Sequence, residues 1–269
     1  MIHIEKTLYP GGTTHVLTMS YDDGTHDDRR LVEIFNKYGI RGSFHLISSR
    51  LGTPNCVSRE EVATLYKGHE VSSHTVNHQW NTKLSSENVI YESIEDRRDL
   101  ESLCGYVVRG MSYPYGDYDE RTIGLFRACG IEYSRTTKST QRFDFPTDPL
   151  VWHPTCASRK GMMDRLEEFY TPQRYENGRL LYVWGHSFEF DRPDYENSWE
   201  DIEEFCKRAA GHENTWYATN IEIIDYMNAQ KELRTSADGH ILYNPTATDV
   251  WVKADGQPVK VPAGQTVIL

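Results

Sequence analysis

Two adjacent aspartates at the end of an apolar run are the residues best placed to do chemistry. Residues 16–24 read Val-Leu-Thr-Met-Ser-Tyr-Asp-Asp-Gly. This pattern predicts a buried strand, with Asp22 and Asp23 at its carboxyl end, where α/β folds gather functional side chains. Two carboxylates in one cleft repel each other, and a divalent cation relieves them if one aspartate binds it and the other serves as a base. The alternative is a plain turn, because Asp-Gly pairs are common turn formers.

A pair of histidines is the second candidate. His74 and His78 are four residues apart in His-Thr-Val-Asn-His, so their rings share one face if that turn is helical. Such a pair alone is more often structural. Together with a carboxylate at a nearby strand end, it predicts a metal site that keeps open positions for water, as catalytic sites do.

Two further polar motifs follow predicted strands. Ser-Tyr-Pro-Tyr-Gly covers residues 112–116 and Trp-Gly-His covers residues 184–186. Each is a weak signal alone, and a merely structural role is the alternative for a lone histidine such as His186. Because parallel strands of one barrel end at the same rim, we expect these motifs to lie near the aspartates.

The elements that must position these residues alternate between strand and helix. After the strand that ends in the aspartates, further strands are predicted at 40–47, 70–73, 106–108, 131–134, 180–184 and 216–218. Helices are predicted at 25–38, 58–66, 85–103, 119–129, 162–170, 198–210 and 221–233, and a long irregular loop at 136–158. About seven strand–helix units predict an α/β fold with a parallel barrel and helices outside.

After residue 233 the pattern changes to short β-type runs separated by turn signals. The sequence therefore predicts a barrel over residues 1–233 and a small β-rich appendage over residues 234–269 that packs on it. A structural cap is the favoured role for the appendage, and sugar binding through Trp251 is the alternative.

Composition narrows the class of partner. The 269 residues carry a formal net charge of −11, which argues against nucleic acid and anionic membranes as partners. No apolar run has membrane-spanning length and the first residues lack a signal-peptide pattern, so the chain as given is expected to be cytoplasmic. The five cysteines are scattered without CxxC spacing and predict reduced thiols rather than a zinc site.

Taken together, the motifs resemble those of the NodB-like polysaccharide deacetylases, carbohydrate esterase family 4, over residues 16–226. The stretch Ser-Tyr-Asp-Asp-Gly is similar to the family's first motif, and residues 74–78 resemble its second. Pro-Tyr-Gly at 114–116 resembles the third motif and Trp-Gly-His at 184–186 the fifth. The resemblance implies a distorted (β/α)7 barrel.

The resemblance also implies a role for each matched residue. Asp22 corresponds to the catalytic base, the backbone N–H of Tyr115 to the oxyanion donor, and His186 to the general acid. The implied ligands of one divalent ion, zinc or another first-row metal such as Co²⁺, are Asp23, His74 and His78.

Two departures from the family pattern concern the partners of these residues. Arg109, the candidate for the arginine that steadies Asp22, lies five residues before Pro114 instead of two or three. The fourth motif, whose aspartate tunes the acid histidine, has no clean match. Asp144, Asp148 and Trp152 lie in the corresponding loop without an assignable role.

The function that the resemblance implies is metal-dependent removal of acetyl groups from an N- or O-acetylated oligo- or polysaccharide. Aromatic residues near the motifs suit stacking on sugar rings, and Trp80, Tyr113 and Trp184 are the candidate substrate contacts, although core packing explains such residues equally well. One alternative is hydrolysis of a small non-sugar amide on the same barrel. Another is a non-catalytic carbohydrate-binding protein. The sequence leaves the sugar, the metal and the oligomeric state open.

Overall fold

The fold is built on one parallel β-sheet, seen in a computed structural model that describes residues 1–172 and 178–269. Its strands are β2 (His15–Asp23), β3 (Gly42–Leu46), β4 (Glu70–Ser73), β5 (Gly110–Ser112), β6 (Tyr133–Arg135), β7 (Cys156–Ala157), β8 (Arg179–Gly185) and β9 (Thr215–Tyr217). The strand order is β6-β5-β4-β3-β2-β8-β7, and β9 pairs with the first residues of β2. The longest strand, β2, is therefore the centre of the sheet.

The segment that contains β7 joins the two edges of this sheet. The Trp152 N–H donates to the carbonyl of Ser134 at 3.0 Å, next to β6. Four residues later, Cys156 pairs with Val183 of β8. The sheet is thereby curled into the distorted (β/α)7 barrel that the sequence predicted.

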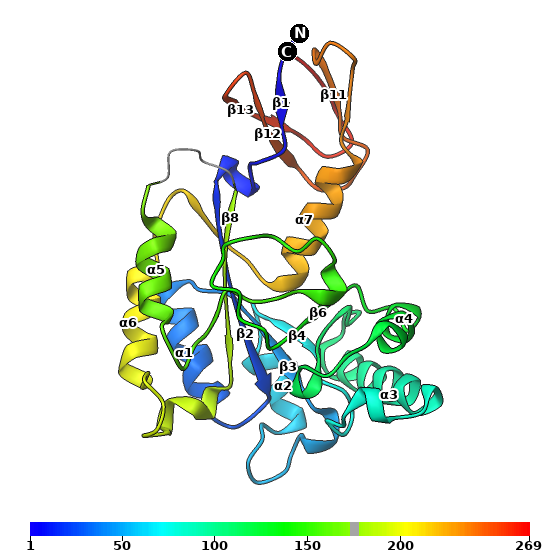
Figure 1. Cartoon of the computed structure of the whole chain (residues 1–269), viewed down its shortest axis with the longest axis vertical. Coiled ribbons are helices and arrows are strands. Elements are labelled where there is room, and N and C mark those ends of the chain that lie inside the picture. The colour runs from blue at the N-terminus through cyan, green and yellow to red at the C-terminus, as the bar shows by residue number, and fades with distance from the viewer. Residues whose placement is uncertain (173–177) are drawn as a thin grey trace.

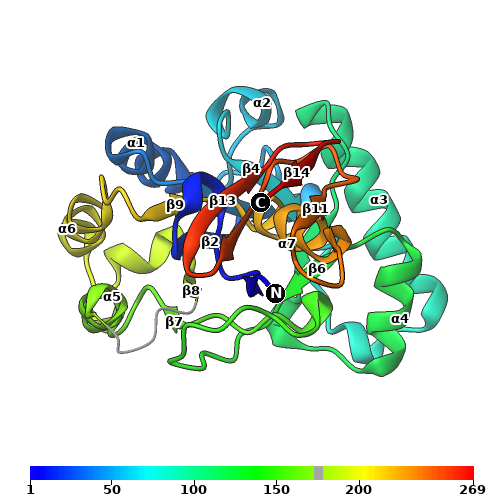
Figure 2. The same cartoon turned by 90° about the horizontal axis from the view of Figure 1, so that it is seen from above.

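Among the described residues, seven α-helices follow the strands; all but the last lie around the outside of the barrel, and the last lies over its amino end (Figures 1 and 2). They are α1 (Asp28–Tyr38), α2 (Val62–Leu65), α3 (Ser86–Cys104), α4 (Glu120–Ala128), α5 (Met162–Tyr170), α6 (Trp199–Ala209) and α7 (Asn220–Glu232). Most begin at a polar cap, as when the Ser85 side chain accepts the N–H of Asn88 at the start of α3. Gly105 ends that helix in the left-handed conformation that glycine adopts without a steric cost.

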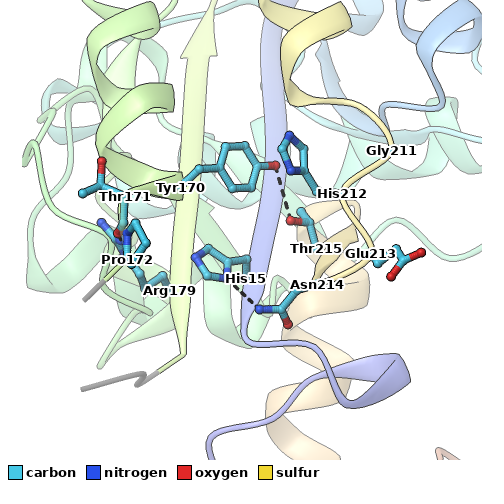
Figure 3. A pocket seen from close by; sticks show the side chains of 10 residues that line it. All are labelled: His15, Tyr170, Thr171, Pro172, Arg179, Gly211, His212, Glu213, Asn214 and Thr215. Carbon is cyan, nitrogen blue, oxygen red and sulfur yellow. Dashed lines mark hydrogen bonds between the residues drawn. The ribbon is translucent and has the colours of Figure 1, made fainter. Parts of the chain in front are cut away.

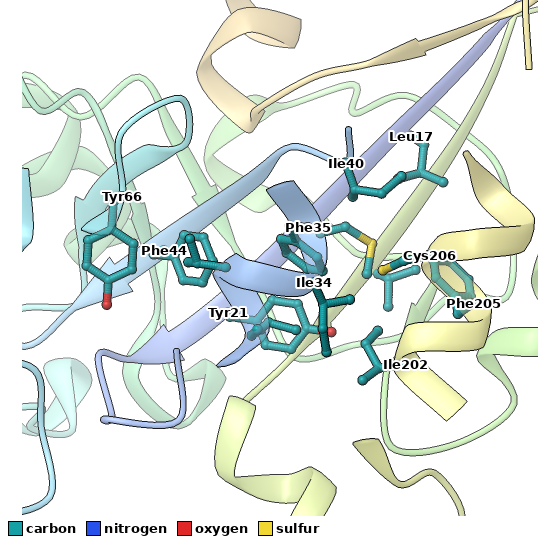
Figure 4. Close-up of a cluster of buried hydrophobic side chains, with 14 of the residues drawn as sticks. Leu17, Tyr21, Ile34, Phe35, Ile40, Phe44, Tyr66, Ile202, Phe205 and Cys206 are labelled. Atoms are coloured by element: carbon teal, nitrogen blue, oxygen red, sulfur yellow. The ribbon is translucent and has the colours of Figure 1, made fainter. Parts of the chain in front are cut away.

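The alternation of side chains along β2 separates the core from the site. Leu17, Met19 and Tyr21 face outward into the main apolar cluster, where they meet residues of α1 and α6 such as Phe35 and Phe205 (Figure 4). The residues between them face the interior of the barrel and form hydrogen bonds there. Thr18 bonds Asn220, Ser20 bonds His45, and Asp22 accepts a hydrogen bond from Ser112. The barrel interior below the site is therefore polar.

Three local predictions differ from the structure. The strand predicted at 106–108 is wrong: Val107 is exposed, and β5 begins at Gly110, where a Cβ would lie only 2.1 Å from the Tyr133 ring. The helix predicted at 58–66 begins as a 3₁₀ turn, Arg59–Glu61, and continues as the short α2. The loop predicted at 136–158 contains β7, a strand of two residues without a periodic pattern to reveal it.

The last part of the chain forms two small antiparallel sheets. One has the order β1-β12-β13 and the other β10-β11-β14. Their strands are β1 (Ile4–Glu5), β10 (Arg234–Thr235), β11 (Ile241–Tyr243), β12 (Val250–Ala254), β13 (Gln257–Val261) and β14 (Thr266–Ile268). Because β1 is paired with β12, the first residues of the chain take part in this appendage.

The appendage lies beyond the amino ends of the barrel strands and packs on the end of α7 (Figure 1). Leu242 and Val252, which are fully buried, meet Ala229 and Leu233 in one apolar cluster. We therefore keep as a proposal that the barrel ends and the appendage begins at residue 233. Strand β1 is added to the appendage, because it pairs with β12. Within the described residues, no helix combines the length and apolar character that crossing a membrane requires.

Candidate active site

Asp23, His74 and His78 come together at the carboxyl ends of β2 and β4. One ligand atom from each lies within 4.8 Å of the others. The distances from Asp23 Oδ1 are 3.9 Å to His74 Nε2 and 4.0 Å to His78 Nε2. Asp23 Oδ1 and His78 Nδ1 are buried and have no hydrogen-bond partner among the residues that the structure describes. Buried polar atoms without partners are costly, and a bound cation would satisfy Asp23 Oδ1.

The other ring nitrogen of His74, Nδ1, lies within hydrogen-bonding distance of Ser112. Its Nδ1 is 2.9 Å from the carbonyl oxygen of Ser112 and 2.7 Å from the Ser112 hydroxyl. Such an outer hydrogen bond fixes the orientation of a ligating imidazole and leaves Nε2 for the metal. Burial is the main cause that lowers the pKa of His74, to about 3, so the ring is neutral as a ligand must be.

The two histidines approach each other without a helix between them, so the helical turn that would put both rings on one face is not the conformation here. Thr75 and His78 instead have positive φ angles of 64° and 54°. Asp23 and Tyr115 also have positive φ angles, 79° and 59°. Such conformations are uncommon for residues other than glycine and persist where surrounding contacts hold them, often at functional sites.

Asp22 is buried beside the metal face, the name used here for the grouped ligand atoms of Asp23, His74 and His78. Arg135 keeps Asp22 ionised. The Arg135 guanidinium forms an ion pair with the Asp22 carboxylate, and the Ser112 hydroxyl donates to the same carboxylate at 3.0 Å. Burial alone would raise the pKa of Asp22, but neighbouring groups, first among them the charged Arg135, outweigh burial and hold that pKa well below its usual range.

The assignment of Arg109 to Asp22 is wrong. Arg109 precedes β5 and donates to Asp225 at 2.8 and 2.7 Å and to Glu132 at 3.1 Å, at the amino end of the barrel. Arg135 comes instead from the end of β6. The sequence carried a signal for it, because Arg135 directly follows the strand predicted at 131–134, as the other site residues follow theirs.

His186 lies at the end of β8 with a carboxylate behind it. Its Nδ1 is 3.3 Å from Glu189 Oε1, and Glu189 is itself buried. Burial lowers the pKa of His186, but Glu189, Asp22 and Asp23 more than compensate, so that pKa lies above its ordinary value. Glu189 was not singled out from the sequence, although it lies only three residues after the histidine.

None of the three unassigned loop residues takes the place of this carboxylate. Asp144 pairs with Arg142 at 2.6 Å, and the Asp148 side chain accepts the N–H of Leu150. Trp152 is buried in the closing segment of the barrel.

The three predicted substrate contacts have different surroundings. Tyr113 is only 1% exposed and its hydroxyl donates to the Leu150 carbonyl, so its assignment to substrate binding is wrong. Trp184 is 8% exposed and supports Arg135, whose guanidinium lies 4.4 Å from its ring centre. Trp80 is 44% exposed at the rim and stacks on Tyr115.

A separate cavity of about 600 Å³ lies at the amino end of the barrel, far along β2 from the aspartates (Figure 3). Its lining comprises His15, Tyr170, Thr171, Pro172, Arg179, Gly211, His212, Glu213, Asn214 and Thr215. None of the residues predicted to act in catalysis lines it. The candidate active site is therefore the carboxyl rim and not this cavity.

Comparison with known proteins finds similarity to polysaccharide deacetylases. The sequence model of the family described as polysaccharide deacetylase matches residues 11–134. Chitin deacetylase 1 of Cryptococcus neoformans is 25% identical over 169 residues, which are 59% of this chain and 35% of that protein. The peptidoglycan-N-acetylglucosamine deacetylase PgdA of Listeria monocytogenes is 26% identical over 119 residues, 42% of this chain and 25% of PgdA. The chain thus spans about 35% of the length of the first relative and 25% of the second.

Solved structures show the same fold at low sequence identity. The Xyl-CE4 domain of a multidomain xylanase from the hindgut metagenome of Trinervitermes trinervoides has a TM-score of 0.56 and 14% identity, covering 80% of this chain and 91% of that domain. Peptidoglycan deacetylase PdaC of Bacillus subtilis has a TM-score of 0.54 and 16% identity, covering 83% and 97%. The barrel is that of the carbohydrate esterase family 4 enzymes. Over residues 11–134 the sequence is thus similar to the polysaccharide deacetylase family, and the fold agrees with that similarity.

Proposed function

We propose that the protein is a metal-dependent hydrolase that removes acetyl groups from an N- or O-acetylated carbohydrate. The observation that carries this proposal is the convergence of a buried ionised Asp22, three grouped ligand atoms and a protonatable His186 on one rim. A protein that only bound carbohydrate would have no use for a base, a ligand set and an acid held together at such cost in burial.

Asp23, His74 and His78 fit a divalent ion, because their ligand atoms are grouped and the buried Asp23 Oδ1 lacks any other partner in the described chain. Zinc suits a site of two imidazoles and one carboxylate, and Co²⁺ or another first-row metal is compatible with it. When bound, such an ion polarises an acyl oxygen and makes a water molecule more acidic.

The residues around this site supply the proton transfers. Asp22, kept ionised by Arg135, accepts a proton from the attacking water. The Tyr115 backbone N–H lies in the turn after β5 and is the proposed donor to the oxyanion. His186, whose pKa is raised, donates a proton to the departing amine or alcohol.

The proposed substrate is an acetylated oligo- or polysaccharide. The names of the relatives refer to chitin and to peptidoglycan N-acetylglucosamine, and both polymers carry N-acetyl groups. Hydrolysis of a small non-sugar amide on the same rim is the second candidate, and the same assay distinguishes the two.

Acetate release from acetylated chitin, peptidoglycan and xylan oligosaccharides, measured with and without a chelator, tests the proposal. We expect release from at least one of them, loss with the chelator, and recovery when Zn²⁺ or Co²⁺ is restored. Asp22→Asn is expected to keep the metal and to lose about 10²-fold or more in turnover. Hydrolysis that survives complete metal removal, or that Asp22→Asn leaves intact, would contradict it.

A further inference from the structure

Four side chains form a column that runs from solvent to the metal face. The Lys83 ammonium lies 4.4 Å from the centre of the Trp80 ring. Trp80 and Tyr115 are stacked with ring centres 4.4 Å apart and planes 7° apart. Tyr115 in turn meets His78 edge to face, with centres 4.4 Å apart and planes at 65°. We call Lys83, Trp80, Tyr115 and His78 the ring column.

The ring column joins two rim loops that carry different parts of the proposed chemistry. His78, Trp80 and Lys83 belong to the loop after β4, whereas Tyr115 belongs to the turn after β5. The first loop supplies a metal ligand and the second supplies the oxyanion donor. A side-chain contact between them therefore fixes the distance between these two functions.

The two inner members of the column are those in uncommon backbone conformations. His78 and Tyr115 both have positive φ angles, which residues other than glycine rarely adopt. Stacked aromatic rings attract each other, and so do a cation and the ring below it. The column therefore helps to hold both residues in these conformations.

The surroundings of Trp80 do not suit a free platform for a sugar ring. The Tyr115 ring stacks on the indole, and the Lys83 ammonium also lies over the indole ring. Trp80 is nevertheless 44% exposed. Its closest aromatic contact points inward, toward the ligand histidine, and not outward toward substrate.

We propose that Trp80 is a positioning residue that holds Tyr115, and through Tyr115 the ligand His78, in the geometry the site requires. The inference rests on the proposed function, because it takes His78 as a metal ligand and Tyr115 as the oxyanion donor. Trp80 touches neither the metal nor the reacting atoms and acts only through its neighbours.

Binding of Co²⁺ alone to metal-free full-length protein tests this role without any substrate. Trp80→Ala is expected to weaken Co²⁺ binding roughly 10-fold, as for loss of an outer contact to a metal ligand, and to change the visible absorption of the bound cobalt. Trp80→Phe, which restores a stacking ring, is expected to recover both signals. Tyr91→Ala on α3 is the matched control, because Tyr91 is 55% exposed and lies outside the column.

Two further variants keep the test decisive if Trp80→Ala folds poorly. Tyr115→Ala removes the next ring and is expected to give the same loss of Co²⁺ affinity. Lys83→Met removes only the outer cation and is expected to change affinity less than about 5-fold. Thermal unfolding of each metal-free variant separates a loss of fold from a loss of geometry.

Three results would overturn the inference, each in a different way. Wild-type affinity and cobalt spectrum in Trp80→Ala would mean that the column does not position His78. A higher KM for acetylated oligosaccharide, with unchanged Co²⁺ binding and unchanged hydrolysis of a small aryl acetate, would make Trp80 a sugar contact instead. Wild-type protein that binds no Co²⁺ would refute the proposed function itself, and the inference with it.

Discussion

Two carboxylates and two positive groups set the acid–base chemistry of the site residue by residue. Asp22 faces the Arg135 guanidinium and stays ionised, while His186 faces Glu189 and gains affinity for its proton. Burial opposes the charged form of both groups, and in both a specific neighbour overcomes it. The proposed base, Asp22, is thereby ionised while the proposed acid, His186, holds its proton more tightly.

Glu189→Gln tests how His186 keeps its proton. The change removes a negative charge 3.3 Å from His186 Nδ1, so the pKa of the histidine should fall. Because the proposed acid acts when protonated, amide hydrolysis is lost as pH rises through this pKa, and the variant should lose activity at lower pH than wild type. The kcat profile against pH on an amide substrate measures the shift. An unmoved alkaline limb would assign that limb to another group.

Arg135 and Arg109 offer a matched comparison of two arginines. Arg135→Ala leaves Asp22 buried without its cation, at a cost of about 3–5 kcal/mol in the free energy of unfolding. It should also raise the pKa of Asp22, so that activity is lost at a higher pH on the acid side. Arg109→Ala breaks the partly exposed pairs with Asp225 and Glu132 and should cost about 1 kcal/mol with an unchanged acid limb. Equal effects of the two changes on the acid limb would contradict the assignment of Arg135, and not Arg109, as the partner of Asp22.

The sequence predicted those site residues whose types alone suggest chemistry. Asp22, Asp23, His74, His78 and His186 lie on one rim because strand ends of a parallel barrel converge there. Partners such as Arg135 and Glu189 were missed because charged residues of their kind are common everywhere. Only the three-dimensional contact distinguishes Arg135 from Arg109.

At the scale of elements, the longest helix anchors the histidine loop. The Glu92 carboxylate of α3 accepts the backbone N–H of Asn77 at 2.8 Å and its side-chain amide at 2.6 Å. Asp96, one turn on, accepts from the N–H of Ser48 and the hydroxyl of Ser73 at the ends of β3 and β4. Burial raises the pKa of Asp96 to about 7. The loop that carries the two histidines is therefore supported from outside the barrel.

Glu92→Ala should disturb the metal face without removing a ligand. The bonds that hold Asn77, between the two histidines, would be lost, and Co²⁺ affinity should fall about 10-fold or more. Glu95→Ala on the same helix is the control, because Glu95 pairs only with the exposed Arg98 and its loss should cost about 0.5 kcal/mol or less. Cobalt titration and circular dichroism measure affinity and helix content. Unchanged Co²⁺ affinity in Glu92→Ala would show that the loop keeps its conformation without the hydrogen bonds to Glu92.

Elements with a clear period were predicted within a few residues, as for α5, whose bounds are those expected. Elements without a clear period were not predicted. The closing strand β7 is two residues long and carries no alternation, and β5 is placed by the close approach of Gly110 to Tyr133. The conformation of residues 74–78 depends on Glu92 and Asp96, far along the chain, so local spacing could not give it.

At the scale of the whole molecule, the candidate active site at the carboxyl rim and the appendage lie at opposite ends of the barrel (Figure 1). Helix α7 connects the interior of the barrel to the appendage. Its first residue, Asn220, bonds Thr18 in the barrel interior, and its last turns pack against the appendage. The pairing of β1 with β12 adds a second connection. We therefore expect the barrel and the appendage to unfold together.

Leu242→Ala tests this coupling. Leu242 is fully buried among Leu233, Val250 and Val252, and its truncation should lower the free energy of unfolding by about 2–5 kcal/mol. Because α7 belongs to both parts, the loss should appear as one calorimetric transition at a lower temperature. The kcat and KM at 25 °C should not change, because the aspartates lie at the far end of β2. An early separate transition, with activity retained above it, would instead make residues 234–269 an independent unit and leave the barrel stable on its own.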